Sequence, residues 1–337
     1  MKTTKTINRL TCIALLSVGV IAAAQEMPDA KDSGKAYEIK LARPMKVGMK
    51  YSMTADGALV RQVTLKKGFV TQKQPDDGFG VHFEGTVEVL ALDDIGEEAK
   101  VACTIDKCTR LTSEGETELV AKGKVLIAEG KGKDTVFSLK DGGELSKEAS
   151  EALELVISLD TDDKLNDDDL LGTKEKKKVG ESWPVTSENV AKDYERAKAT
   201  VKPEDVEGSF RLDGLEKVGD TECLKLSGNL KVKHMVTKAD ENEDDRLPEG
   251  YVVEGGSMEA KYSGLFPVDT SVGSLAESAS MTFVTHIKGK GGAGRAKANA
   301  KADGKAGAKE GDDDAVTVES RVQRAVEMKR RWLEPKS

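Results

Sequence analysis

Lys46-Val47-Gly48-Met49-Lys50-Tyr51 recurs in altered form later in the chain as Lys178-Val179-Gly180-Glu181-Ser182-Trp183. Each copy is followed by two glycines with ten residues between them: Gly85 and Gly96, then Gly208 and Gly219. We interpret this pattern as an internal duplication of a β-rich unit. The alternative is a coincidence in a β-protein that is rich in lysine and glycine.

Aligning the two halves on these glycines also brings their apolar residues together. The matched residues are Val87 and Phe210, Val89 and Leu212, Leu92 and Leu215, Ile95 and Val218, Val101 and Leu224, and Cys103 and Leu226. Most are two positions apart, which is typical of strands with one buried face, and the glycines mark tight connections. We therefore predict a mainly β fold with a few helices (α+β), built from two related curved antiparallel sheets.

The chain is predicted to contain two β-rich halves joined by a charged connection. The first half covers residues 25–160 and ends in a helix over 144–159, where apolar residues recur at helical spacing. The connection covers residues 161–178, and the second half covers residues 179–335. A shorter helix is predicted over residues 187–199, and both helices are expected to cover a face or an opening of a sheet.

The second half contains a low-complexity segment. Residues 288–314 are nearly all Gly, Ala, Lys and Asp, a composition that buries too little apolar area to offset the entropy of ordering. We predict a mobile linker or a long hairpin tip there, inserted before a final strand over residues 316–332. Residues 278–288 alternate in the same way, so the two strands are expected to pair antiparallel. A helix is the alternative for the final segment.

The first residues have the layout of a secretory signal peptide. Three basic residues precede an apolar stretch from Leu10 to Val20, and Ala22-Ala23-Ala24 follows it. We expect residues 1–24 to be removed by cleavage after Ala24 and the protein to be secreted or periplasmic. The apolar stretch is too short to cross a ~30 Å hydrocarbon layer, and no later stretch approaches ~20 apolar residues. No transmembrane segment is therefore expected in the mature chain.

The charge balance argues against a nucleic-acid partner. The sequence has 52 basic and 60 acidic residues, and loss of residues 1–24 leaves 49 basic residues and a net charge of −11. Binding to nucleic acid needs clustered positive charge that displaces counterions from phosphates. Aromatic residues make up 4% of the chain and charged residues 33%, so we expect aliphatic cores and densely charged surfaces.

No arrangement of residues suggests catalysis, a metal or a cofactor. The histidines lie in predicted strands without a carboxylate or second histidine at ligand spacing: His82, His234 and His286. One acidic run lacks the glycine and the spacing of a calcium loop: Asp160, Asp162, Asn166 and Asp168. Signatures of serine hydrolases and zinc proteases are absent from the sequence. We predict a protein that is not an enzyme, and the sequence identifies no ligand-binding residue.

Three cysteines remain after residue 24, so the chain allows one disulfide at most. Cys103 and Cys108 are five residues apart and would lie on opposite faces of an uninterrupted strand. Because Cys103 aligns with Leu226, a buried core position is expected for it. A disulfide from Cys223 to Cys103 or Cys108 stays open.

Tyr51 and Trp183 occupy matching positions in a chain that is poor in aromatic residues. One interpretation is a platform on which a sugar ring stacks. The alternative, which we favour, is that each aromatic side chain seals the end of a core where its strand begins.

Three phrases resemble those of uncharacterised exported bacterial proteins with domains of unknown function: Lys178–Pro184, Gly214–Gly219 and Tyr262–Asp269. The resemblance covers roughly residues 35–335 and implies structural motifs without catalytic residues. The repeated hairpins bounded by glycines, with a covering helix, are also similar in outline to the half-barrel sheets of periplasmic lipoprotein carriers. Fold alone does not confer function.

Two functions are compatible with these patterns. The first is an exported, non-catalytic protein that binds a lipid or another hydrophobic ligand between a curved sheet and its helices. It predicts that inward strand positions such as Val87, Val89 and Val101 face a cavity. The second is a structural or interaction module of the cell envelope or surface that docks other proteins through exposed strand edges. The oligomeric state stays open.

Overall fold

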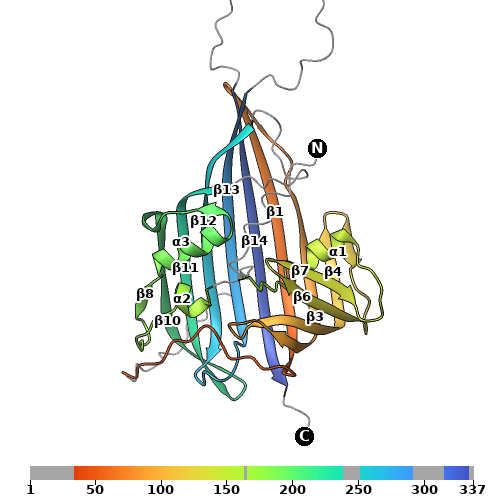
Figure 1. Cartoon of the computed structure of the whole chain (residues 1–337), viewed down its shortest axis with the longest axis vertical. Coiled ribbons are helices and arrows are strands. Elements are labelled where there is room, and N and C mark those ends of the chain that lie inside the picture. Colours follow the sequence, from red (N-terminus) through yellow and green to blue (C-terminus); the bar gives the residue numbers. More distant parts are fainter. Residues whose placement is uncertain (1–33, 163–164, 238–250, 291–314, 334–337) are drawn as a thin grey trace, which may run out of the picture.

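The computed structural model describes residues 34–162, 165–237, 251–290 and 315–333 (Figure 1). The expected signal peptide, residues 1–24, lies outside these ranges. Residues 291–314, which form most of the expected linker, also lie outside them. Within the described ranges, no helix is both long enough and apolar enough to cross a bilayer.

The described residues form one large antiparallel sheet and three α-helices. The strands follow the order β7-β6-β4-β3-β1-β14-β13-β12-β11-β10-β8, while β2 pairs with β1, β5 with β4 and β9 with β11. The strands are β1 (Lys50–Lys67), β2 (Val70–Lys73), β3 (Asp77–Leu92), β4 (Glu98–Thr112), β5 (Gly115–Glu118), β6 (Val125–Lys131), β7 (Asp134–Leu139), β8 (Ser182–Pro184), β9 (Ala199–Thr200), β10 (Val206–Val218), β11 (Thr221–Thr237), β12 (Tyr251–Pro267), β13 (Ala276–Lys290) and β14 (Ala315–Leu333).

The predicted class, mainly β with a few helices, is confirmed, but the two halves share one sheet instead of forming two. Strand β14 pairs with β13 on one side and with β1 on the other, from Lys50 opposite Leu333 to Lys67 opposite Val316. Without β14, the edge of β1 would present a long row of unpaired backbone groups. The final strand therefore joins the halves.

The expected pairing of the last two strands is confirmed. Ser278 lies opposite Glu327, and Lys288 lies opposite Thr317, in an antiparallel ladder. The final strand covers Ala315–Leu333, which includes the predicted range of 316–332, and the helical alternative is wrong. Because β13 continues to Lys290, the first residues assigned to the linker belong to a strand.

The repeated phrase forms the same turn in both places. The backbone N–H of Met49 donates to the carbonyl of Lys46 over 3.1 Å, and that of Glu181 donates to Lys178 over 3.0 Å. The intervening glycines have φ angles of 86° and 90°. Glycine favours this left-handed conformation at the third position of a type II turn, so the phrase encodes a turn at the entrance to β1 and β8.

Both turns dock on equivalent points of the neighbouring strand. The N–H of Gly48 donates to the carbonyl of Val89 over 2.8 Å, and the N–H of Gly180 donates to that of Leu212 over 2.7 Å. Val89 and Leu212 are the residues that the sequence alignment matched. These bonds support the internal duplication, which stays a prediction.

Helices cover one face of the curved sheet. The helix α2 (Asp167–Leu171) and the helix α3 (Ser187–Arg196) lie over the side formed by β10–β12, and α1 (Lys147–Leu153) lies beside β3, β4 and β7 (Figure 1). A short 3-10 turn, Pro203–Asp205, follows α3. The fully buried side chains of Phe83, Ile105 and Leu212 lie in the core on this covered side.

The helix predicted over residues 144–159 is shorter than expected. It begins after its N-cap, Ser146, and ends at Leu153, beyond which hydrogen bonds of the tighter i→i−3 type carry the chain to Val156. β-branched Val156 and Ile157 are poor helix formers. They are buried all the same, so their apolar spacing reflects packing against the sheet and not a longer helix.

Candidate functional site

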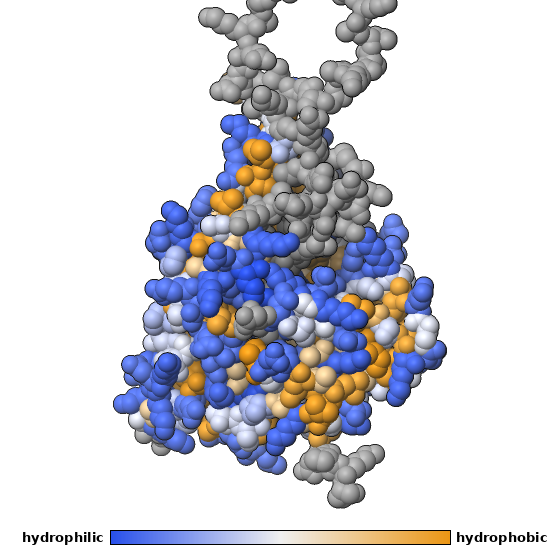
Figure 2. Space-filling view, viewed as in Figure 1, coloured by the Kyte–Doolittle hydropathy of each residue, from blue (hydrophilic) through white to orange (hydrophobic). Residues whose placement is uncertain are grey.

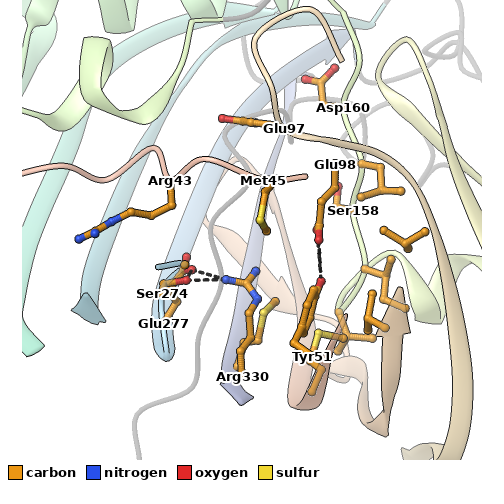
Figure 3. Close-up of a pocket in the computed structure, with 18 of the residues that line it drawn as sticks. Arg43, Met45, Tyr51, Glu97, Glu98, Ser158, Asp160, Ser274, Glu277 and Arg330 are labelled. Atoms are coloured by element: carbon orange, nitrogen blue, oxygen red, sulfur yellow. Dashed lines mark hydrogen bonds and ion pairs between the residues drawn. The ribbon is translucent and has the colours of Figure 1, made fainter. Parts of the chain in front are cut away.

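A cavity of about 200 Å³ lies on the covered face of the sheet, near its middle. Its floor is formed by β1, β3, β4, β13 and β14. Two extended segments cross over it: residues 41–45, which we call the first strap, and residues 156–160, which we call the second strap. Figure 3 shows the first strap running above Tyr51 and Arg330, with Ser158 and Asp160 of the second strap on the other side.

Most of the floor is apolar. Its apolar side chains come from the inward positions of β1, β3, β4 and β14 and include Met53, Val87, Val101, Cys103 and Met328. The prediction for Val87 and Val101 is confirmed, because both line the cavity. Val89 does not line it, although it lies on the same face of β3 and is fully buried. Other side chains therefore pack over Val89, whereas the side chain of Val87 borders the cavity.

One end of the cavity is polar. The hydroxyl of Tyr51 donates to both carboxylate oxygens of Glu98, over 3.0 and 3.2 Å (Figure 3). Burial raises the pKa of Glu98 above its usual range, and burial together with the nearby Glu98 raises the pKa of Tyr51. The pair therefore places a desolvated carboxyl group and a neutral phenol at the cavity wall.

Arg330 lies beside this pair. Its Nη1 atom donates to Ser274 Oγ and to Glu277 Oε1, each over 2.6 Å, and its guanidinium lies 5.6 Å from the centre of the Tyr51 ring. Burial opposes the charge of Arg330, but Glu277, Tyr51 and Glu98 together raise its pKa, so it stays charged. Its buried Nε atom has no hydrogen-bond partner among the described residues.

The first strap is held down by Arg43 and Leu41. Arg43 donates to the carbonyls of Pro267 and Asp269, each over 3.1 Å. It points away from the pair of Tyr51 and Glu98 (Figure 3). The N–H of Leu41 donates to Asp168 Oδ1 over 2.6 Å. These contacts fix the strap in place and hold the guanidinium of Arg43 on Pro267 and Asp269.

The second strap is held by a buried ion-pair group. Arg196 Nη1 lies 3.1 Å from Asp160 Oδ2, and Arg196 Nε lies 3.1 Å from Asp193 Oδ1. Both carboxylates are about 4% exposed. Asp160, the first residue of the acidic run, therefore anchors the strap to α3.

Two further residues of that run, Asn166 and Asp168, have structural roles. Asn166 caps α2 by accepting from the N–H of Asp169 over 3.0 Å. Asp168 accepts from the first strap and lies 3.3 Å from Lys40 Nζ. Across the ranges that the structure describes, no cluster of three or more His, Cys, Asp or Glu side chains is arranged to hold a metal ion.

The expectation that His82 has no carboxylate within reach is wrong, because two carboxylates contact its ring. Its Nδ1 atom lies 2.7 Å from Asp56 Oδ1, and its Nε2 atom lies 2.9 Å from Glu84 Oε1. Asp56 is on the neighbouring strand β1, directly opposite His82. This cross-strand cluster lies on β1 and β3 outside the set of residues that line the cavity.

All three described cysteines are buried free thiols. The expectation that Cys103 and Cys108 lie on opposite faces is wrong. The register of β4 against β3 shifts between Ile105 and Lys107, and this irregularity turns Cys108 to the same buried side as Cys103. Burial raises the pKa of both thiols, to about 12 for Cys108. Only Cys103 lines the cavity.

The matched aromatic residues are both buried, as favoured from the sequence. Trp183 is 3% exposed, donates to the carbonyl of Leu171 over 2.8 Å and stacks on Phe210. Tyr51 is 2% exposed and packs on Trp332 at a centroid distance of 4.9 Å. Neither ring offers an open face for a sugar, but Tyr51 also directs its hydroxyl to the polar end of the cavity.

Comparison with known proteins gives weak likenesses only. No protein-family model matches the chain, and no curated protein matches it. Among solved structures, a chain described as "Lipid-protein interactions in lipovitellin" has 10% sequence identity and a TM-score of 0.29 over 87% of this chain and 26% of that chain. This chain therefore spans about a quarter of the length of that one.

Two further solved structures have lower scores. The attachment invasion locus protein Ail of Yersinia pestis has 9% identity and a TM-score of 0.13, over 84% of this chain and 99% of that chain. A mutant of the monoaromatic hydrocarbon channel TodX has 9% identity and a TM-score of 0.13, over 86% of this chain and 91% of that chain. Scores of this size do not establish a shared fold.

Proposed function

We propose that the protein is an exported, non-catalytic binding protein, and that it holds a small, mostly apolar molecule in the cavity beneath the two straps. The observation that carries the proposal is the cavity over Val87, which has an apolar floor and one polar end. Closely packed interiors rarely leave such space. A lined cavity with convergent polar groups is the usual form of a binding site for a small molecule.

The volume limits the ligand. An apolar cavity of about 150 Å³ accommodates benzene, whereas sites for drug-sized ligands measure about 300–1,000 Å³. The cavity of about 200 Å³ therefore fits a molecule with one ring or a short chain. A whole membrane lipid is too large for it.

The polar end favours a hydrogen-bond donor on the ligand. Glu98 is a desolvated acceptor whose pKa is raised by burial, and Arg330 is already neutralised by Glu277 over 2.6 Å. A ligand hydroxyl or amine that donates to Glu98 would replace part of the hydration that burial removes. A ligand carboxylate would instead meet Glu98 and Glu277.

Thermal unfolding with three ring compounds tests the proposal. Cyclohexanol and cyclohexylamine are expected to raise the unfolding midpoint, because each has an apolar ring and one donor group, a hydroxyl in the first and a protonated amine in the second. Cyclohexanecarboxylate at neutral pH is expected to leave the midpoint unchanged. Equal shifts with all three compounds, or no shift with any of them, would contradict the proposed site.

Two variants of β3 provide a matched control. Val87→Phe fills the cavity, so it is expected to abolish the shift while the protein stays folded. Val89→Phe introduces the same ring two residues away, where there is no cavity, so it is expected to lower stability by about 1–3 kcal/mol and to keep the shift. Persistence of the shift in Val87→Phe would place binding elsewhere.

A further inference from the structure

The turn between β1 and β2 exposes an aromatic side chain that the fold does not use. Phe69 is fully exposed, and the adjacent Val70 is 69% exposed. Gly68, with φ of 53°, provides the left-handed conformation that the turn needs. Turns of this length favour Gly, Asn or Asp. The local backbone therefore gives no reason for a phenylalanine in this position.

The same hairpin is basic. Residues 64–74 contain three lysines and no acidic residue: Lys66, Lys67 and Lys73. Lys66 lies 3.6 Å from Glu319, and Lys73 lies 3.3 Å from Asp76, but all four side chains are at least a third exposed. Such exposed ion pairs contribute little to stability, so lipid phosphates can replace these carboxylates at low cost.

An apolar row lies directly behind the turn. It crosses four neighbouring strands, in which Val253 pairs with Ile287, Ile287 with Val318, and Val318 with Leu65. All four side chains are half-buried. The row and the turn lie at the narrow end of the sheet (Figure 1), where apolar side chains are visible at the surface (Figure 2).

We propose that the tip formed by Gly68, Phe69 and Val70 docks the protein on an anionic lipid surface. Aromatic rings favour the boundary between headgroups and acyl chains, and neighbouring lysines are attracted to anionic headgroups. A second copy of the chain fits less well, since stable protein interfaces bury about 800 Å² on each partner. The exposed apolar side chains of the tip are Phe69 and Val70, whereas such interfaces involve about 20–30 residues on each side. The inference does not depend on the cavity.

Binding of the full chain to vesicles tests this inference. Vesicles of equimolar phosphatidylglycerol and phosphatidylcholine are expected to bind the protein, and added salt or vesicles of phosphatidylcholine alone are expected to weaken binding. Phe69→Ser is expected to weaken binding by about tenfold, equivalent to about 1.4 kcal/mol. The matched control, Leu111→Ser, removes another apolar side chain that is 58% exposed and is expected to bind normally.

A local probe shows whether the tip itself enters the lipid. Phe69→Trp is expected to give a blue shift of tryptophan emission when vesicles are added, whereas Leu111→Trp is expected to give none. Absence of that shift, or equal binding of Phe69→Ser and the unmodified chain, would overturn the inference. A dimer that Phe69→Ser converts into a monomer, without vesicle binding, would overturn it in favour of self-association.

Discussion

At the scale of single residues, the polar end of the cavity depends on groups that are distant in sequence. Tyr51 and Glu98 are 47 positions apart, and Arg330 comes from the last strand. The sequence predicted that Tyr51 is buried. It did not predict Glu98 or Arg330 as its neighbours, because those contacts require the register of β1 against β14 and the path of the chain between β3 and β4.

Replacing Glu98 with glutamine is expected to change how stability depends on pH. Burial raises the pKa of Glu98 in the folded protein, so the folded state holds this proton more tightly than the unfolded state. Glu98 therefore lowers stability progressively as the pH rises above the ordinary glutamate pKa of about 4.3. Glu98→Gln should gain stability relative to the unmodified protein above that pH, as measured by urea unfolding at several pH values. Parallel pH curves would contradict this.

Replacing Arg330 with methionine is expected to lower the free energy of unfolding by about 1–3 kcal/mol, because the half-buried carboxylate of Glu277 then keeps only the hydroxyl of Ser274 as a partner. The double variant Arg330→Met with Glu277→Gln should recover part of this loss, since the uncompensated charge is removed. Urea unfolding of both single variants and the double variant measures the coupling. Additive losses would mean that the 2.6 Å contact contributes no interaction energy.

At the scale of elements, periodicity predicted strands well and irregularities poorly. The alternation in residues 316–332 correctly predicted β14, and the repeated phrase correctly marked the start of β1 and β8. The irregularity in β4 and the early end of α1 were missed. In β4, a single extra residue reverses which of the following positions face inward, and no sequence pattern marks it. After α1, the buried apolar residues beyond Leu153 keep a helical spacing although the helix has ended.

The two phrase turns are expected to respond equally to mutation. Gly48→Ala and Gly180→Ala each force an alanine into a positive φ, at a cost of about 1–2 kcal/mol. Neither added methyl group would meet an atom closer than 3.9 Å. Gly214→Ala is the control, because its site is open and its φ is not positive. Denaturant unfolding measures all three, and an effect at Gly48 alone would argue against equivalent turns.

At the scale of the whole molecule, the final strand unites the halves. The sequence assigned this strand to the second half, where it does pair with β13, but its second partner, β1, could not be read from a pattern. Pairing between strands so far apart in sequence is set by which open edges remain once each half has formed its local hairpins. The class of fold was therefore predictable, and the continuity of the sheet was not.

A proline in the middle of β14 is expected to disturb both halves. Ala325 lies opposite Ala58 of β1 and Ser280 of β13, so Ala325→Pro should cost about 3 kcal/mol or more. Hydrogen exchange should accelerate in β3 and β4 as well as in β11 and β12. Val136→Pro, in the edge strand β7, should have a smaller and local effect. Acceleration confined to one half would show that the halves are independent.

The central claim is that the cavity beneath the two straps holds a small ligand, and the most direct test is a crystallographic map of the protein as purified or soaked with cyclohexanol. We predict continuous density for a small molecule, with its apolar part against Val87 and Val101 and its donor within hydrogen-bond distance of Glu98. The same map for Val87→Phe should show the new ring in that space. A cavity closed by protein side chains, or one that holds only water after soaking, would contradict the claim.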